Sequence, residues 1–334
     1  MTGDSCEFAE NERSPLRNTC ATIRSDTFVL SFRNNAAAAD NNQDATMDKN
    51  TKILLKIGLD FLLLLCVGFP ILIFFIWGEP YQRGFFCDDE SLRHPFHEST
   101  VRNWMLYIIG LILPISIMIV TEVVLESRNG YRPSNIRIFN WEVPEWFRQC
   151  YVKIGIFGFG AACSQLTTDI AKYSIGRLRP HFYSLCQPIR ADNTTCNDPQ
   201  NQGIYIEDFH CINDPTHRLL KEMRLSFPSG HASFSAYTLI YLSIYLQARM
   251  TWSGSKLMRH ALQFVFLMMF WFTALSRVSD YKHHWSDVLS GALIGTTTAI
   301  LVVRFISDLF TYRRQGSSLP ISRRGLDTPS NGEL

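Results

Sequence analysis

Three separated stretches guide the interpretation of this sequence: KYSIGRLRP at residues 172–180, PSGH at 228–231 and SRVSDYKHHWSD at 276–287. Each stretch lies at the edge of an apolar run. Together they supply three cations, two histidines, a carboxylate and a glycine at a helix start. If the chain crosses a membrane, all three can meet at one face. Such a set of groups is suited to holding and transferring a phosphate group.

Composition indicates a membrane protein. Of the 334 residues, 46% are hydrophobic, and they are concentrated in long runs in the middle of the chain. The net charge of +2 gives no argument for nucleic-acid binding, and the sequence has no Walker loop and no zinc-type cysteine pairing. Residues 1–48 and 313–334 are predicted to be disordered cytoplasmic tails, and residues 49–312 to form the membrane domain.

Six apolar stretches are near the length that a helix needs to cross a bilayer. The fold class predicted is therefore all-α, a polytopic membrane protein with six transmembrane helices. The fourth stretch is short and rich in Ser and Tyr, so it is expected to face other helices. Pro70 and Pro114 are expected to kink the first two spans, since proline removes a backbone donor. The predicted spans are 53–77, 104–124, 151–171, 231–248, 261–278 and 285–310.

Charged residues near the span ends predict the orientation. Arginines and lysines gather in the connections after the second and fourth spans and in the C-terminal tail, so this side and both termini are expected to be cytoplasmic. The opposite side contains Asn193 in the glycosylation signal Asn-Thr-Thr, although such a triplet also arises by chance. Four cysteines on that side can form disulfides, in any of three pairings: Cys87, Cys186, Cys196 and Cys211.

The first two stretches offer anion-binding groups. Lys172 and Arg179 are about two helical turns apart and would project from one side of a continued helix. Ser229, Gly230 and His231 open the fourth span, where free backbone N–H groups favour an anion. The alternatives are ordinary interfacial cations and a simple helix cap with an interfacial histidine.

The third stretch is the most specific. His283 and Asp287 are four residues apart and would share one face of a helix. Asp287 is expected to accept the proton of one ring nitrogen, which leaves the other nitrogen free as a nucleophile. Arg277 lies just upstream at the end of the fifth span. His284 would point away from the site and is assigned a surface or supporting role.

The three stretches together resemble a known family. The spacings Lys-x6-Arg-Pro, Pro-Ser-Gly-His and Ser-Arg-x5-His-x3-Asp match the signatures of the type 2 phosphatidate phosphatase (PAP2) superfamily. The chain is most similar to the animal lipid phosphate phosphatases, and residues 169–182 and 276–287 look most like insect Wunen-type members. The resemblance covers the six predicted spans and leaves out both tails. No motif position departs from the pattern.

The resemblance implies a mechanism without metal or cofactor. His283 would attack phosphorus to form a phosphohistidine, Asp287 would orient it, and His231 would protonate the leaving alkoxide and then activate water. The expected substrates are phosphatidate, lysophosphatidate, ceramide 1-phosphate and sphingosine 1-phosphate, hydrolysed at the extracellular or lumenal face. The predicted localisation is the plasma membrane, with an internal membrane as the alternative. Because relatives in this family associate as dimers, a homo-oligomer is also possible. The expected phosphate-binding residues are Lys172, Arg179, Ser229, Gly230 and Arg277.

Other function classes remain to be compared. A catalytically silent membrane scaffold would be marked by loss of His231, His283 or Lys172, and all three are present. A transporter or channel would place charges near the bilayer midplane or show inverted repeats, whereas here the charges lie at the span edges. A sphingolipid head-group transferase is disfavoured by the cationic signature with Pro-Ser-Gly-His.

Overall fold

The computed structural model describes residues 49–129, 133–138, 141–213, 216–250 and 255–310. The tails predicted at 1–48 and 313–334 lie outside the described residues. The described part is mostly helical, and its short strands are confined to the connections. The long helices are α1 (Lys49–Trp77), α3 (Leu113–Asn129), α4 (Glu145–Ile175), α7 (Gly230–Arg249), α8 (Lys256–Ser279) and α9 (Trp285–Leu301).

Within the described residues, four helical segments are long and apolar enough to cross a membrane: Thr51–Trp77, Asn103–Arg128, Leu257–Ser279 and Trp285–Ile306. They correspond to the first, second, fifth and sixth predicted spans. Helices α4 and α7 occupy the other two predicted positions, but they do not meet the same criterion of apolar composition. For α7 the reason is burial, because most of its side chains pack against other helices and can therefore include Ser, Thr and Tyr.

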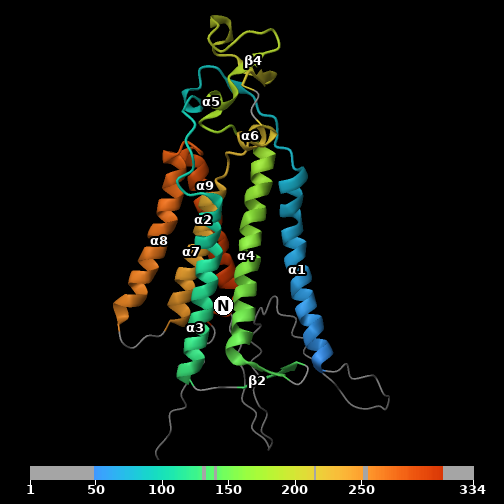
Figure 1. The fold of residues 1–334 in the computed structure, drawn as a ribbon, viewed down its shortest axis with the longest axis vertical. Helices are drawn as coiled ribbons and strands as arrows, with labels where there is room; N and C mark the ends of the chain where they lie inside the picture. The colour runs from blue at the N-terminus through green and yellow to red at the C-terminus, as the bar shows by residue number, and fades with distance from the viewer. Residues whose placement is uncertain (1–48, 130–132, 139–140, 214–215, 251–254, 311–334) are drawn as a thin grey trace, which may run out of the picture. The chain divides into compact units, whose positions relative to one another are not determined.

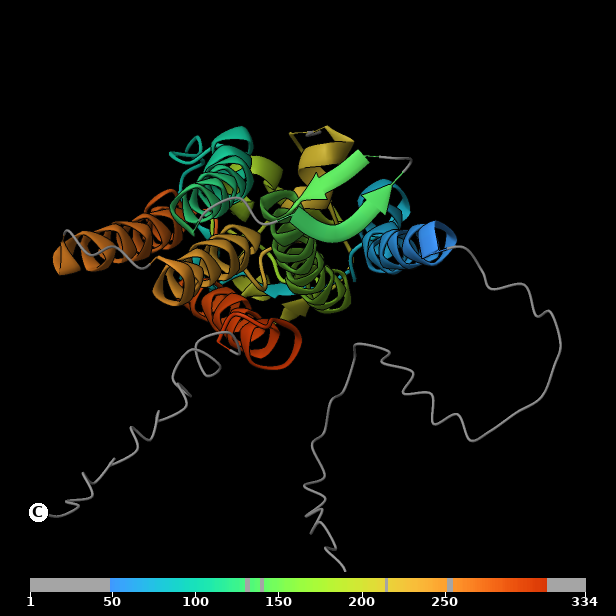
Figure 2. The same cartoon turned by 90° about the horizontal axis from the view of Figure 1, so that it is seen from below.

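Helix α7 lies among α3, α4, α8 and α9, while α1 stands beside α4 at the edge (Figure 2). Two glycines let α9 approach α7 closely. A Cβ atom on Gly291 would lie 2.4 Å from the carbonyl oxygen of Ser229, and one on Gly295 would lie 2.1 Å from that of Ser233. Small residues spaced four apart are a common means of close helix packing in membranes. Here they bring together the starts of α7 and α9.

The second predicted span is irregular near its proline. The short helix α2 (Asn103–Tyr107) continues into the π-helical segment η2 (Ile108–Ile112), and α3 then begins just before Pro114. A proline has no N–H for the helical ladder, and a π turn is one way to accommodate that loss. Helix α1, in contrast, continues through Pro70 as one helix. Another π-helical segment, η4 (Val302–Ile306), follows α9.

A cap covers one end of the helices (Figure 1), formed by the described residues between 78 and 102 and between 176 and 229. Disulfides Cys87–Cys196 and Cys186–Cys211 cross it, which selects one of the three pairings that the sequence left open. Strand β1 (Phe85–Phe86) pairs with β5 (Tyr205–Ile206), and β4 (Pro188–Arg190) with β6 (Phe209–Cys211), both antiparallel. The cap also holds η1 (Glu90–Leu92), α5 (Phe182–Cys186), η3 (Pro199–Asn201) and α6 (His217–Glu222).

At the opposite end, a short antiparallel hairpin connects α3 to α4. It consists of β2 (Pro133–Ile138) and β3 (Trp141–Pro144). The cap and this hairpin therefore mark the two ends of α4, and the three motifs belong to the cap end (Figure 1).

Candidate active site

The end of α4 delivers the first pair of cations. Lys172 lies in the last turn of the helix, and Gly176 then turns the chain with a left-handed φ of 59°. A side chain could not replace this glycine easily, because its Cβ would lie 2.0 Å from the carbonyl oxygen of Tyr81. Arg179 follows in the cap, and its backbone N–H donates to the carbonyl of Met223.

The start of α7 faces Lys172. Ser229 caps the helix, and its hydroxyl accepts a hydrogen bond from the backbone N–H of Ala232. A Cβ on Gly230 would lie 3.6 Å from the ammonium nitrogen of Lys172, so these two residues are in direct proximity. The helix start and the lysine thus present their positive ends to the same place.

His283 is held by a backbone carbonyl. Its Nδ1 lies 2.7 Å from the carbonyl oxygen of Ser226 and 3.9 Å from the nearer oxygen of Asp287. The expected hydrogen bond from His283 to Asp287 is therefore not formed. The expectation assumed a helix through both residues, whereas α9 begins only at Trp285. Because a carbonyl can only accept, this contact puts the proton on Nδ1 and leaves the lone pair on Nε2.

Asp287 is instead the centre of a network around His283. Its side chain is fully buried and accepts hydrogen bonds from Arg177 Nη1 at 2.5 Å and from the Ser226 hydroxyl at 2.6 Å. It also accepts from the backbone N–H of His284 at 3.0 Å and lies 3.1 Å from Nδ1 of that ring. Ser226 therefore touches both Asp287 and His283, and it connects the carboxylate to the histidine indirectly.

Arg277 is anchored to the loop before α2. It donates to the carbonyl of Val101 at 3.0 Å and to the hydroxyl of Ser99 at 3.0 Å, and it lies 3.8 Å from Asp280. His231 also makes a hydrogen-bonding contact with the backbone of Val101. The end of α8 and the start of α7 thus converge on one short segment of the cap.

Three buried nitrogens of the motif residues have no hydrogen-bond partner among the residues that the structure describes. They are Nε of Arg179, Nε of Arg277 and Nε2 of His231. Buried polar groups are normally paired, so exceptions in one cluster indicate the place of a ligand. Two of the three are obligate donors on cations, which matches a ligand with several anionic oxygens.

The charged groups of this cluster influence the protonation of one another. Burial lowers the pKa of His283 well below its usual range, and the charges of Arg179, Lys172 and Arg277 lower it further. His231 acts on it in the same direction. Burial and the charge of Arg179 also lower the pKa of Lys172 to about 8. His283 is accordingly neutral at physiological pH, which is the form that can act as a nucleophile.

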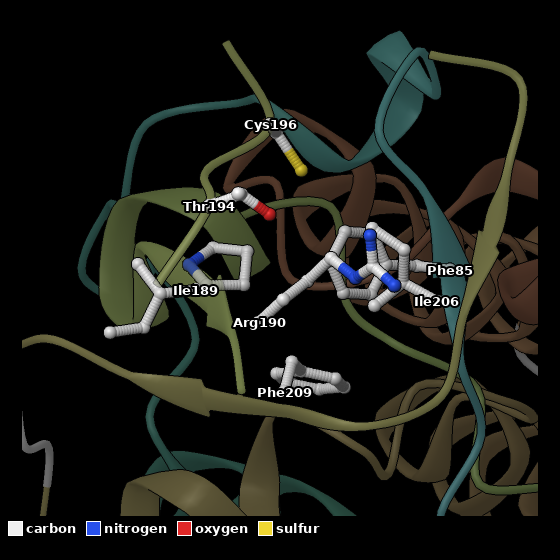
Figure 3. Close-up of a pocket in the computed structure, with 8 residues that line it drawn as sticks. Phe85, Ile189, Arg190, Thr194, Cys196, Ile206 and Phe209 are labelled. Atoms are coloured by element: carbon white, nitrogen blue, oxygen red, sulfur yellow. The ribbon is translucent and has the colours of Figure 1, made fainter. Parts of the chain in front are cut away.

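Across the described residues, no three His, Cys, Asp or Glu side chains are grouped so that they could hold a metal ion. A small hollow in the cap (Figure 3) contains none of the motif residues. It is lined by Phe85, Pro188, Ile189, Arg190, Thr194, Cys196, Ile206 and Phe209.

Comparison with known proteins agrees with this arrangement of motifs. The PAP2 superfamily matches residues 153–310, which include all three stretches. A Drosophila melanogaster protein named putative phosphatidate phosphatase is 61% identical over 79% of this chain and 72% of its own length. The chain belongs to the PAP2 superfamily. This PAP2 phosphatase is also 42% identical to rat phospholipid phosphatase 1, over 75% of this chain and 85% of the relative. The chain is 37% identical to human phospholipid phosphatase 2, over 76% of this chain and 84% of the relative. No solved structure matched the chain.

Several residues of the PAP2 phosphatase site escaped the sequence interpretation. Ser226 and Arg177 lie beside or inside two of the motifs, but only the folded chain shows that both bind Asp287. His284, predicted to point away, is the N-cap of α9 and binds Asp287. The sequence carries one signal for the contact between α7 and α9, namely Gly291-x3-Gly295, a spacing that indicates close helix packing.

Proposed function

We propose that this PAP2 phosphatase hydrolyses phosphomonoesters of lipids through a phosphohistidine on His283. The observation that carries the proposal is the contact of His283 Nδ1 with the Ser226 carbonyl at 2.7 Å, which leaves Nε2 available to attack phosphorus. The positive charges that surround His283 are those of Lys172, Arg179 and Arg277. They would bind the phosphoryl oxygens and stabilise the charge that develops during transfer.

The reaction would take place in two displacements. In the first, Nε2 of His283 forms a bond to phosphorus while the ester P–O bond breaks, and His231, in its protonated form, gives a proton from Nε2 to the departing alkoxide. In the second, His231 takes a proton from water, the water oxygen attacks phosphorus, and the N–P bond breaks to release inorganic phosphate. Ser229 and the Gly230 backbone N–H would bind phosphoryl oxygens at the start of α7. No step requires a metal ion.

The proposed substrates are phosphatidate, lysophosphatidate, ceramide 1-phosphate and sphingosine 1-phosphate.

We further propose six membrane spans, with α4 and α7 as the third and fourth. Both termini would lie in the cytoplasm, and the site would lie at the outer face of the plasma membrane. Two disulfides and the exposed Asn193 in the cap support an extracytoplasmic cap. Oligomeric association stays a prediction.

In the test, the purified protein is mixed with a lipid substrate that is labelled in its phosphate, and the reaction is quenched rapidly. Wild type should show an acid-labile, base-stable adduct that maps to His283, and His283→Ala should show neither adduct nor turnover. Label on Ser229 or Asp287 would contradict the assignment of the nucleophile. Turnover should persist in excess EDTA, and a complete loss that magnesium restores would overturn the metal-free mechanism.

A further inference from the structure

Lys282 immediately precedes His283 and is not part of any of the three motif patterns. We propose that Lys282 is a further phosphate-binding cation of this site, which recognises the doubly charged phosphate of a monoester together with Lys172, Arg179 and Arg277. The inference rests on the proposed function and extends it to a residue that determines substrate class.

The first argument is that Lys282 is a buried charge that forms no ion pair with any residue the structure describes. The residue is 6% exposed, and its ammonium lies 3.6 Å from the centre of the Phe96 ring. Within the part of the chain that the structure describes, no carboxylate lies within ion-pair distance of it and no side-chain hydrogen bond compensates it. An aromatic face stabilises a cation only in part, and an uncompensated buried charge is costly. An anionic ligand would remove that cost.

The second argument is position. The backbone N–H groups of Lys282 and His283 both donate to the carbonyl of Arg277, at 3.1 and 3.2 Å. One carbonyl therefore fixes the tight turn that carries both side chains. Burial lowers the pKa of Lys282 to about 8, the charges of Arg179 and Arg277 act in the same direction, and the charges of Glu222 and Asp280 oppose them in part. Lys282 therefore belongs to the same electrostatic cluster as the proposed nucleophile.

The third argument is that nearby carboxylates are engaged elsewhere. Asp280 accepts hydrogen bonds from the backbone N–H and the hydroxyl of Thr100, at 2.8 and 2.7 Å. Asp287 is occupied by Arg177, Ser226 and His284. The cluster is thus rich in positive charge, which suits a phosphate that carries between one and a half and two negative charges near neutral pH. A phosphodiester, with one charge, would gain less from a fourth cation.

The experiment compares charge removal at Lys282 with charge removal at a matched lysine. Lys221, in α6, also lies over an aromatic ring, that of Tyr173, but it donates to the Phe75 carbonyl instead of facing the site. Full-length Lys282→Met, Lys282→Gln, Lys282→Arg and Lys221→Met would be purified in detergent micelles. Binding of inorganic phosphate would be measured from the rise in melting temperature with phosphate concentration, and turnover would be measured separately on lysophosphatidate.

We expect both neutral Lys282 variants to weaken phosphate binding by about tenfold or more, since a hydrogen bond to a charged group is lost. KM should rise in parallel, and the preference for a phosphomonoester over a phosphodiester should fall. Lys282→Arg should stay within about threefold of wild type, because the charge is retained. Lys221→Met should bind phosphate like wild type.

Unchanged phosphate binding in a folded neutral variant would overturn the inference. So would loss of the cooperative thermal transition in both neutral variants, because Lys282 would then be a structural residue. Failure of the proposed function looks different: wild type would turn over no lipid phosphate, whatever the phosphate affinity of the Lys282 variants.

Discussion

Asp287 is placed to influence the orientation of the proposed nucleophile, although it makes no hydrogen bond to His283 and lies 3.9 Å from its Nδ1. Its two oxygens are shared among Arg177, Ser226 and His284, and Ser226 alone of these also contacts His283. The carboxylate therefore acts by fixing Ser226, whose carbonyl fixes the tautomer of the histidine. Networks of this kind depend on every member, because removal of one leaves the others buried and unpaired.

Arg177→Gln is expected to lower both activity and stability. The change leaves a fully buried carboxylate with one charged partner fewer. The side chain of Arg177 is 32% exposed, so the free energy of unfolding is expected to fall by about 2 kcal/mol, which is less than for a fully buried pair. Turnover should fall by about tenfold or more, with partial rescue in Arg177→Lys. Thermal unfolding and kcat are the measurements.

Arg218→Gln is the matched control for this change. Arg218 pairs with Glu222 on the surface of the cap at 3.1 Å, with the arginine side chain 80% exposed. Such a pair contributes at most about 1 kcal/mol. If the Arg177 variant behaved like the Arg218 variant, the network around Asp287 would have no role in catalysis.

The pH dependence of substrate binding should reflect the protonation of the two buried lysines. Burial lowers the pKa of both Lys172 and Lys282 to about 8, so their ammonium groups lose protons as the pH rises through that value. Below pH 8 both are charged and bind phosphate, and above it KM should increase. Lys282→Arg should reduce this increase, because arginine stays charged. A KM that is constant between pH 7 and 9.5 in wild type would contradict this expectation.

At the scale of the helices, the contact between α7 and α9 sets the spacing of the site. The start of α7 carries Ser229, Gly230 and His231, and the first turn of α9 carries Asp287. The backbone N–H of Ser229 donates to the Asp287 carbonyl at 2.9 Å, which ties the two helix starts together. Any separation of these helices would therefore move the proposed acid away from the proposed nucleophile.

Gly295→Ala should impair both packing and turnover. The new Cβ would lie 2.1 Å from the Ser233 carbonyl oxygen and 2.8 Å from the Cβ of Ala236, so α9 must shift. Overpacking of this kind costs about 1–3 kcal/mol. Gly158→Ala is the control, since nothing lies within 4 Å of its added Cβ and alanine favours a helix. Equal melting temperatures and equal kcat in the two variants would show that this contact is dispensable.

The sequence predicted the elements better than it predicted their contacts. Six apolar stretches of suitable length predicted the positions of the six long helices, although only four of these segments are apolar enough to meet the criterion for crossing a membrane, and α4 and α7 are not among them. The spacing of His283 and Asp287 suggested a shared helix face, but the helix starts between them, and spacing alone cannot locate that start. The role of the Ser226 carbonyl depends on how the cap returns to α7, which no local pattern encodes.

Across the whole molecule, the two ends of the bundle are stabilised by different chemistry. The cap end has two disulfides, whereas the far end has a buried cluster around Glu122 of α3. Glu122 accepts from Tyr245 at 2.6 Å and from Arg249 at 2.6 Å, and it lies 3.5 Å from Lys153. Disulfides require an oxidising compartment, so this asymmetry favours one orientation in the membrane.

The proposed topology predicts that intact cells hydrolyse an impermeant substrate. With the cap outside, a soluble short-chain lysolipid phosphate added to cells with surface-exposed protein should release phosphate without permeabilisation. Asn193→Gln should remove a glycan-dependent shift in electrophoretic mobility, because Asn193 is exposed in the cap.

Epitope tags measure the topology directly. A tag at Gly203, where an added Cβ meets nothing within 4 Å, should bind antibody on intact cells. A tag at the N-terminus should bind only after permeabilisation. The reverse pattern, in cells that carry the protein at their surface, would place the cap and its site in the cytoplasm and exclude action on extracellular lipid phosphates.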